Sequence, residues 1–211
     1  MKYEKKYERA KNKMIQAGLA LTSLFDQKAR TQIIHHGIYL EGLIGDIIAC
    51  HYGPKEEKHA LTFFKRISSL DKLLKQFYPD IYAATPGLIP GLHNIREVRN
   101  DFAHGELILE EAKLLGNQGK PPDGIFLRTN EKGKVVEKFW PETEIDERLK
   151  LASDLGLLVL FVYGEVKNRV NGGTANFAPF LKIVKRQSPH LLDPTSTRKE
   201  SLKPACISNA K

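Results

Sequence analysis

Apolar residues recur at helical spacing along most of the chain, with polar residues between them. The first two helical stretches, residues 3–27 and 28–52, are either two separate helices or one continuous helix. Gly53-Pro54 ends the second stretch, and Gly105 is a natural end for the fourth. The predicted helices cover residues 3–27, 28–52, 58–78, 90–104 and 141–168, and the apolar side of the third includes Phe63 and Phe64.

Residues 106–140 interrupt the helical pattern. Glycine and proline mark a loop, and two short apolar runs flank Thr129-Asn130-Glu131-Lys132-Gly133, which predicts a hairpin. The fold class is therefore all-α: a four- or five-helix bundle with a small β-hairpin insertion before the last long helix. We expect a basic N-terminal helical extension (1–27), a bundle (28–184) that includes the 106–140 insertion, and a disordered basic tail (185–211).

The net charge of +8 lies at the two ends of the chain. Residues 1–13 carry +4 and residues 182–211 carry +5, so the body is close to neutral at −1. Basic arms bind nucleic acid through its phosphates or are simply solvated, and the pattern leaves both open. No segment has the length and apolarity of a signal peptide or a membrane span, so we expect a cytoplasmic protein with no membrane partner.

The two cysteines do not cluster. Cys50 ends an apolar run and Cys206 lies in the polar tail, which favours neither a disulfide framework nor a zinc site. The chain also lacks a phosphate-binding glycine loop, a nucleophile elbow and the carboxylate cluster of a two-metal nuclease. We therefore expect no metal and no cofactor.

The predicted helix 90–104 carries the most specific chemical signal, Arg99-Asn100-Asp101-Phe102-Ala103-His104. Asn100 and His104 are four residues apart and share a helix face, and the long side chain of Arg99 can reach the same groove. A guanidinium can hold two phosphate oxygens, and an imidazole can exchange a proton near neutral pH. In the alternative interpretation Arg99 pairs with a helical acid such as Asp101, while Asn100 and His104 only cap the helix.

Three further residues are candidates for substrate binding. Arg96 adds positive charge near Arg99, and His93 lies on the same helix, seven residues before Asn100. Glu41 interrupts an apolar helix, where a buried acid needs a partner. It either lines the same cleft or faces solvent, and the sequence leaves both open.

The segment from Ile95 to Gly105 resembles the Arg-polar-x-x-x-His motif of the HEPN superfamily. The wider stretch from Leu40 to Gly105, with "LEGLIGDII" and "IREVRNDFAHG", resembles bacterial HEPN-like proteins, and the resemblance covers about residues 28–168. It implies a bundle of four or five helices that forms a homodimer around a cleft between two motif helices. In nuclease members of the superfamily this cleft cuts RNA without a metal, by attack of the 2′-hydroxyl on the neighbouring phosphate.

The resemblance implies a role for each motif residue. Arg99 would bind the phosphate and stabilise its developing charge, His104 would act as general acid and base, and Asn100 would orient one of them or the substrate. The expected function is a metal-independent endoribonuclease, as in toxin–antitoxin and phage-defence systems, with RNA and an antitoxin or regulatory protein as partners. The alternative is a non-catalytic regulatory or protein-interaction module like the mannitol repressors.

Overall fold

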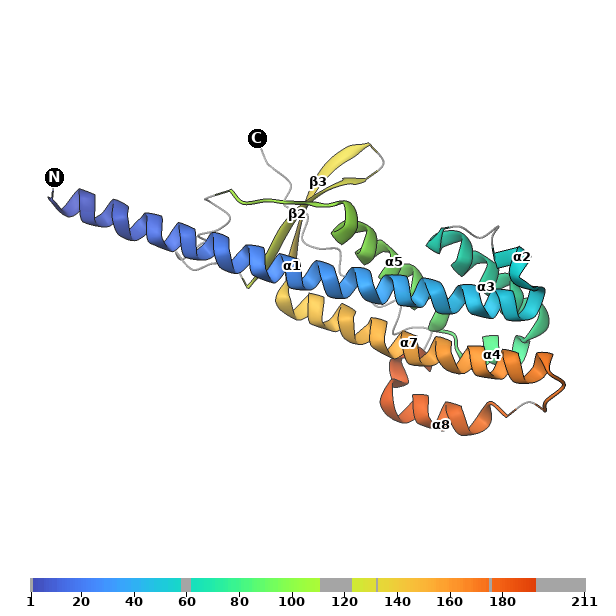
Figure 1. Cartoon of the computed structure of the whole chain (residues 1–211). Helices are drawn as coiled ribbons and strands as arrows, with labels where there is room; N and C mark the ends of the chain where they lie inside the picture. Colours follow the sequence, from blue (N-terminus) through green and yellow to red (C-terminus); the bar gives the residue numbers. More distant parts are fainter. Residues whose placement is uncertain (1, 58–61, 111–122, 132, 175, 193–211) are drawn as a thin grey trace. The chain divides into compact units, whose positions relative to one another are not determined.

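The structure is a computed structural model that describes residues 2–57, 62–110, 123–131, 133–174 and 176–192. These residues are mostly helical and include one small antiparallel sheet, which confirms the mainly helical class in its coarse form (Figure 1). The helices are α1 (Lys2–Tyr52), α2 (Pro54–Glu57), α3 (Phe63–Phe77), α4 (Pro79–Ala84), α5 (Leu88–His104), α7 (Glu142–Val170), α8 (Ala178–Gln187) and the 3-10 helix η1 (Pro189–Leu192). The strands are β1 (Glu106–Leu107), β2 (Gly124–Glu131) and β3 (Lys134–Pro141).

Helix α1 is a single helix of 51 residues, so the two predicted stretches 3–27 and 28–52 are continuous, one of the two possibilities that the sequence left open. It ends at Tyr52, and the following Gly53 has a φ of 95°, which suits glycine, and an N–H that donates to the Ala49 carbonyl over 2.9 Å. By length and composition alone, the stretch Lys11–Tyr52 of this helix is long and apolar enough to cross a membrane. Core helices of soluble proteins and signal sequences share this property.

The chain divides into two compact units. The hairpin unit consists of the described residues within 1–32 and 100–147, and the bundle unit of those within 33–99 and 148–201. Helices α1, α5 and α7 each contribute residues to both units, which are described separately below.

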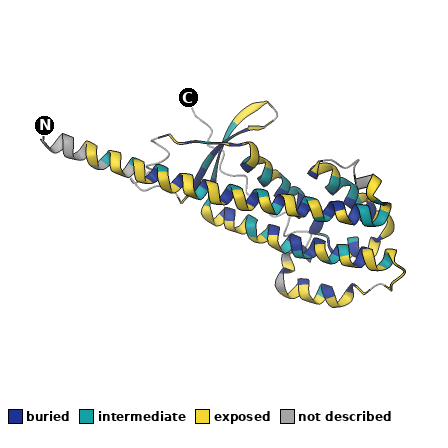
Figure 2. Ribbon diagram, viewed as in Figure 1, coloured by how far each residue is buried: buried dark blue, intermediate teal, exposed yellow. Residues whose placement is uncertain are grey.

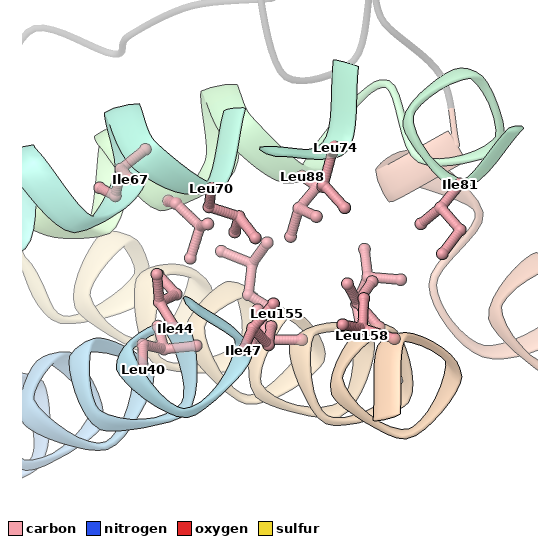
Figure 3. Close-up of a cluster of buried hydrophobic side chains, with 14 of the residues drawn as sticks. Leu40, Ile44, Ile47, Ile67, Leu70, Leu74, Ile81, Leu88, Leu155 and Leu158 are labelled. Atoms are coloured by element: carbon pink, nitrogen blue, oxygen red, sulfur yellow. The ribbon is translucent and has the colours of Figure 1, made fainter. Parts of the chain in front are cut away.

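The core of the bundle unit is made mainly of aliphatic side chains, with a few aromatic ones. Buried positions recur along the bundle helices (Figure 2), and Figure 3 draws part of this core. Figure 3 shows these side chains pointing toward one another from α1, α3 and α7. Each fully buried leucine or isoleucine stabilises the fold by about 1.5–3 kcal/mol relative to exposure. The fully buried members include Leu40, Ile44, Ile47, Ile67, Leu70, Leu74, Leu155 and Leu158.

The hairpin unit contains a three-stranded sheet in the order β1-β2-β3. The predicted hairpin is confirmed: β2 and β3 pair antiparallel from Gly124↔Pro141 to Glu131↔Lys134. The sequence did not predict β1, because a strand of two residues leaves no alternation to detect. The buried Trp140 of β3 packs on Phe102 of α5, with the ring centroids 5.3 Å apart.

Helix α8 continues to Gln187 and η1 covers Pro189–Leu192, which corrects the prediction that the disordered tail begins at residue 185. Leu191 is fully buried, and its carbonyl accepts a hydrogen bond of 3.0 Å from the N–H of Gly87. A Cβ at Gly87 would lie 2.5 Å from that oxygen, so the close contact requires glycine. The rest of the predicted tail, residues 193–211, lies outside the described residues.

Candidate functional site

Helix α5 carries the predicted motif and ends on it. Its residues up to Arg99 belong to the bundle unit, and Asn100–His104 belong to the hairpin unit. The helix ends at His104, and the N–H of the following Gly105 donates to the Asp101 carbonyl over 2.7 Å. A Cβ at Gly105 would lie 2.3 Å from the same carbonyl oxygen, so glycine fixes where the motif helix stops.

In the bundle unit, Arg99 forms an ion pair with Glu41 of α1. The Nη1 atom of Arg99 lies 3.1 Å from Oε2 of Glu41, and the two side chains are 24% and 19% exposed. The aliphatic part of Arg99 lies against Gly37, where an added Cβ would be 2.6 Å from the arginine Cδ. The guanidinium also lies 5.7 Å from the ring centroid of Phe63. Three neighbours from α1 and α3 therefore orient the arginine of the motif.

Glu41 was predicted either to line a cleft with the motif or to face solvent, and the structure places it beside Arg99. Its backbone carbonyl also accepts a 2.8 Å hydrogen bond from Nη1 of Arg66. A guanidinium has five N–H donors, so a contact with one carboxylate leaves donors for a phosphate. Glu41 can therefore hold Arg99 in one orientation without occupying it fully.

The other two predicted binding residues, His93 and Arg96, both contact the ring of Phe64. The sequence pattern predicted Phe64 on the apolar side of its helix. Phe64 of α3 is 52% exposed, and its ring centroid lies 5.0 Å from the Arg96 guanidinium carbon and 5.8 Å from the His93 ring. Burial and the positive charge of Arg96 lower the pKa of His93 below its usual value. This shift favours the neutral form of His93, so Arg96 carries the fixed positive charge of this group.

In the hairpin unit, Asn100 and His104 are exposed and lie one turn apart on α5. Within the described part of the chain, neither side chain makes a hydrogen bond or an ion pair that would cap the helix. The other side of the same turn is buried, since Phe102 is fully inaccessible. The two motif side chains therefore face solvent from a turn whose opposite side is packed.

Two charged side chains hold this last turn of α5. The Arg30 guanidinium of α1 donates to the Phe102 carbonyl, and its Nε donates to the Asp26 carboxylate over 2.7 and 2.8 Å. Lys138 of β3 pairs with Asp101 of the motif over 2.8 Å. Sequence reasoning missed both contacts, because Arg30 and Lys138 are distant from the motif along the chain and carry no pattern of their own.

The described residues contain no group of three or more His, Cys, Asp or Glu side chains arranged to hold a metal ion. No protein-family model, no curated protein and no solved structure matches this chain. The resemblance to the HEPN superfamily therefore rests on the motif and the sequence around it.

Proposed function

We propose that this protein is a metal-independent endoribonuclease of the HEPN type, with a HEPN-like helical bundle. The observation that carries the proposal is the exposure of Asn100 and His104, one turn apart at the held end of α5. A general acid and base must reach solvent and substrate, and it must be carried on a rigid support. Arg30 and Lys138 provide such a support for the backbone of this turn.

In the proposed reaction, the 2′-hydroxyl of one nucleotide attacks the adjacent phosphorus and the bond to the 5′-oxygen breaks. The products are a 2′,3′-cyclic phosphate and a 5′-hydroxyl. The proton lost by the 2′-hydroxyl is balanced by the proton gained at the leaving oxygen, and His104 would exchange both. Arg99 would bind the phosphate as its charge develops, and Asn100 would orient the substrate or His104.

The proposal includes a homodimer, because the family resemblance implies a cleft shared by two motif helices. It also includes the cytoplasm as the location and a toxin or phage-defence role, with an antitoxin or regulatory protein as a partner. Two copies of Arg99 and Arg96 would supply positive charge that the nearly neutral body of one chain lacks.

One observation favours the alternative, a non-catalytic regulatory or protein-interaction module. Arg99 already has a carboxylate partner within its own chain, and a half-buried ion pair is a common structural feature. In this alternative the pair only joins α1 to α5, and the exposed end of the motif helix contacts a protein partner.

The deciding experiment is RNA cleavage in EDTA by the wild-type protein and by His104→Ala. We expect wild-type cleavage with a cyclic phosphate at the new 3′ end, and loss of at least about 100-fold in the variant, the scale of general acid–base catalysis. His35→Ala, which removes another exposed histidine, is the matched control and should cleave normally. The free energy of unfolding of both variants should lie within about 0.5 kcal/mol of the wild-type value, because exposed side chains contribute little to stability.

Two results would contradict the proposal. Equal cleavage by wild type and His104→Ala would show that the motif histidine has no catalytic role. A folded wild-type protein that cuts no RNA, while His104→Ala loses a protein partner, would establish the module instead.

A further inference from the structure

An exposed phenylalanine lies next to an arginine on the surface of the bundle unit. Phe64 is 52% exposed, although Phe63 beside it is 3% exposed and belongs to the core. The two adjacent residues of α3 therefore point in different directions. The core does not account for the large ring of Phe64, which is left at the surface among polar groups.

Arg96 holds an ordered position against this ring. Its guanidinium carbon lies 5.0 Å from the ring centroid, its side chain is 20% exposed, and its Nε is buried without a hydrogen-bond partner. Arg96 forms an ion pair with Glu97, which is 67% exposed, and such surface pairs contribute little. The arginine thus gives up hydration at Nε to lie on the ring, where cation–π attraction offsets part of that loss.

His93 completes the group from the preceding turn of α5. Its ring lies 5.8 Å from that of Phe64 and is half-buried. Phe64, His93 and Arg96 therefore form a small, partly apolar surface with one fixed positive charge, which we call the Phe64 platform. Its members come from two packed helices, so it exists before any ligand binds.

We infer that the Phe64 platform is a stacking site for one unpaired nucleobase of a single-stranded RNA. A nucleobase has a flat π-face, and proteins bind unpaired bases on aromatic rings and on arginine guanidinium planes. The positive charge of Arg96 beside the ring would attract the phosphate joined to such a base. An aliphatic protein ligand would gain from the ring but would have to desolvate the arginine.

The position of the platform supports this ligand class, and here the inference rests on the proposed function. Arg96 and Arg99 are three residues apart on α5, so they lie on neighbouring turns of one helix face. A helical turn rises about 5 Å, which is within the reach of one nucleotide. A base on Phe64 would thus place a phosphate of the same strand near Arg99.

The test measures binding separately from cleavage. The probe is a fluorescent single-stranded 2′-O-methyl oligonucleotide, which lacks the attacking hydroxyl, together with the same backbone carrying abasic sites. Full-length wild type is compared with Phe64→Leu, which keeps an apolar side chain without a ring, and Phe64→Trp, which keeps a ring. Phe77→Ala is the matched control, because Phe77 is an exposed phenylalanine at the other end of α3.

We expect Phe64→Leu to weaken binding of the base-containing probe by about ten-fold, the usual contribution of one stacked base. Phe64→Trp and Phe77→Ala should bind like the wild type, and the abasic probe should bind all four proteins equally. Wild-type affinity in Phe64→Leu, or an equal loss for both probes, would overturn the inference.

Two additional measurements separate the possible failures. If sedimentation shows that Phe64→Leu changes the oligomeric state without a base-dependent loss, the ring lies in a protein contact and the inference is wrong. If natural RNA is cut but Phe64→Leu keeps full affinity, the stacking site fails and the proposed nuclease stands. If base-dependent binding is lost in Phe64→Leu while natural RNA is never cut, the stacking site stands and the nuclease fails.

Discussion

Replacement of Gly37 by alanine separates the placement of Arg99 from the stability of the fold. Gly37 is buried in α1, and an added Cβ would lie 2.6 Å from Cδ and 3.1 Å from Cγ of Arg99. The first distance is shorter than Cβ contacts in real structures and the second is unusually tight, so the arginine stem must move away from α1. Its ion pair with Glu41 would break or lengthen, and the three atoms nearest to the added Cβ all belong to Arg99.

Two opposing effects set the expected stability. Alanine is favoured over glycine inside a helix by about 0.5–1 kcal/mol. Loss of a partly exposed ion pair costs about as much, in the range of 0.2–1 kcal/mol. The free energy of unfolding of Gly37→Ala should therefore stay within about 0.5 kcal/mol of the wild type.

Gly42 of the same helix provides the matched control. No atom lies within 4 Å of a Cβ built at Gly42, so Gly42→Ala gains the helix preference at no steric cost. Urea unfolding followed by circular dichroism should show Gly42→Ala more stable than the wild type by about 0.5–1 kcal/mol. RNA cleavage in EDTA should be normal in Gly42→Ala and strongly reduced in Gly37→Ala. Equal stabilisation and normal cleavage in both variants would refute the positioning of Arg99 by Gly37.

Three further predictions test the support of the motif and the pH response of the fold. Lys138→Met removes the buried ammonium group that pairs with both Asp101 and Glu131, and urea unfolding should show a loss of about 2 kcal/mol, against little change for the exposed Lys134→Met. Phe102→Ala should destabilise the protein by about 3–5 kcal/mol, since the ring is fully buried, and a loss below 1 kcal/mol would contradict its packing. Burial lowers the pKa of His51 from 6.5, so the unfolded chain binds this proton at a higher pH than the folded protein does. The free energy of unfolding should therefore fall as the pH drops below about 6.5 and level off beneath the lowered pKa. His51→Gln should flatten that decline in a pH series of urea titrations, and an unchanged slope would contradict it.

The helices could be predicted from the sequence because their burial is periodic. Leu70, Leu73 and Leu74 lie on one face of α3, and the pattern of apolar positions marks that face without knowledge of its neighbours. The sequence did not decide whether α1 is one helix or two. Helix ends are marked in a sequence by helix-breaking residues, and residues 27 and 28 are ordinary helix formers.

Phe63 and Phe64 show where periodicity stops being informative. The two residues are chemically identical and adjacent, and both fit a broad apolar face. Only the packing of α3 decides that one is buried and the other is exposed beside Arg96. The burial of Leu191 could not be predicted for a similar reason. A single buried leucine after Pro189 forms no periodic pattern, and its contact, Gly87, is distant in the sequence.

Glu41 could be predicted in part, and the missing part is the one that matters for function. An acid in an apolar helix needs a partner, and this rule alone selected Glu41 as a candidate. The identity of the partner depends on the contact between α1 and α5, where Gly37 admits the arginine stem that a larger residue would exclude. The same ion pair fits a structural role and a catalytic one, because a guanidinium held by one carboxylate keeps donors for a phosphate. Gly37→Ala distinguishes these roles, because it moves the arginine and keeps both charged side chains. If the ion pair is only structural, the variant should show a small change in stability alone. If Arg99 is catalytic, the variant should lose RNA cleavage while its stability stays nearly normal.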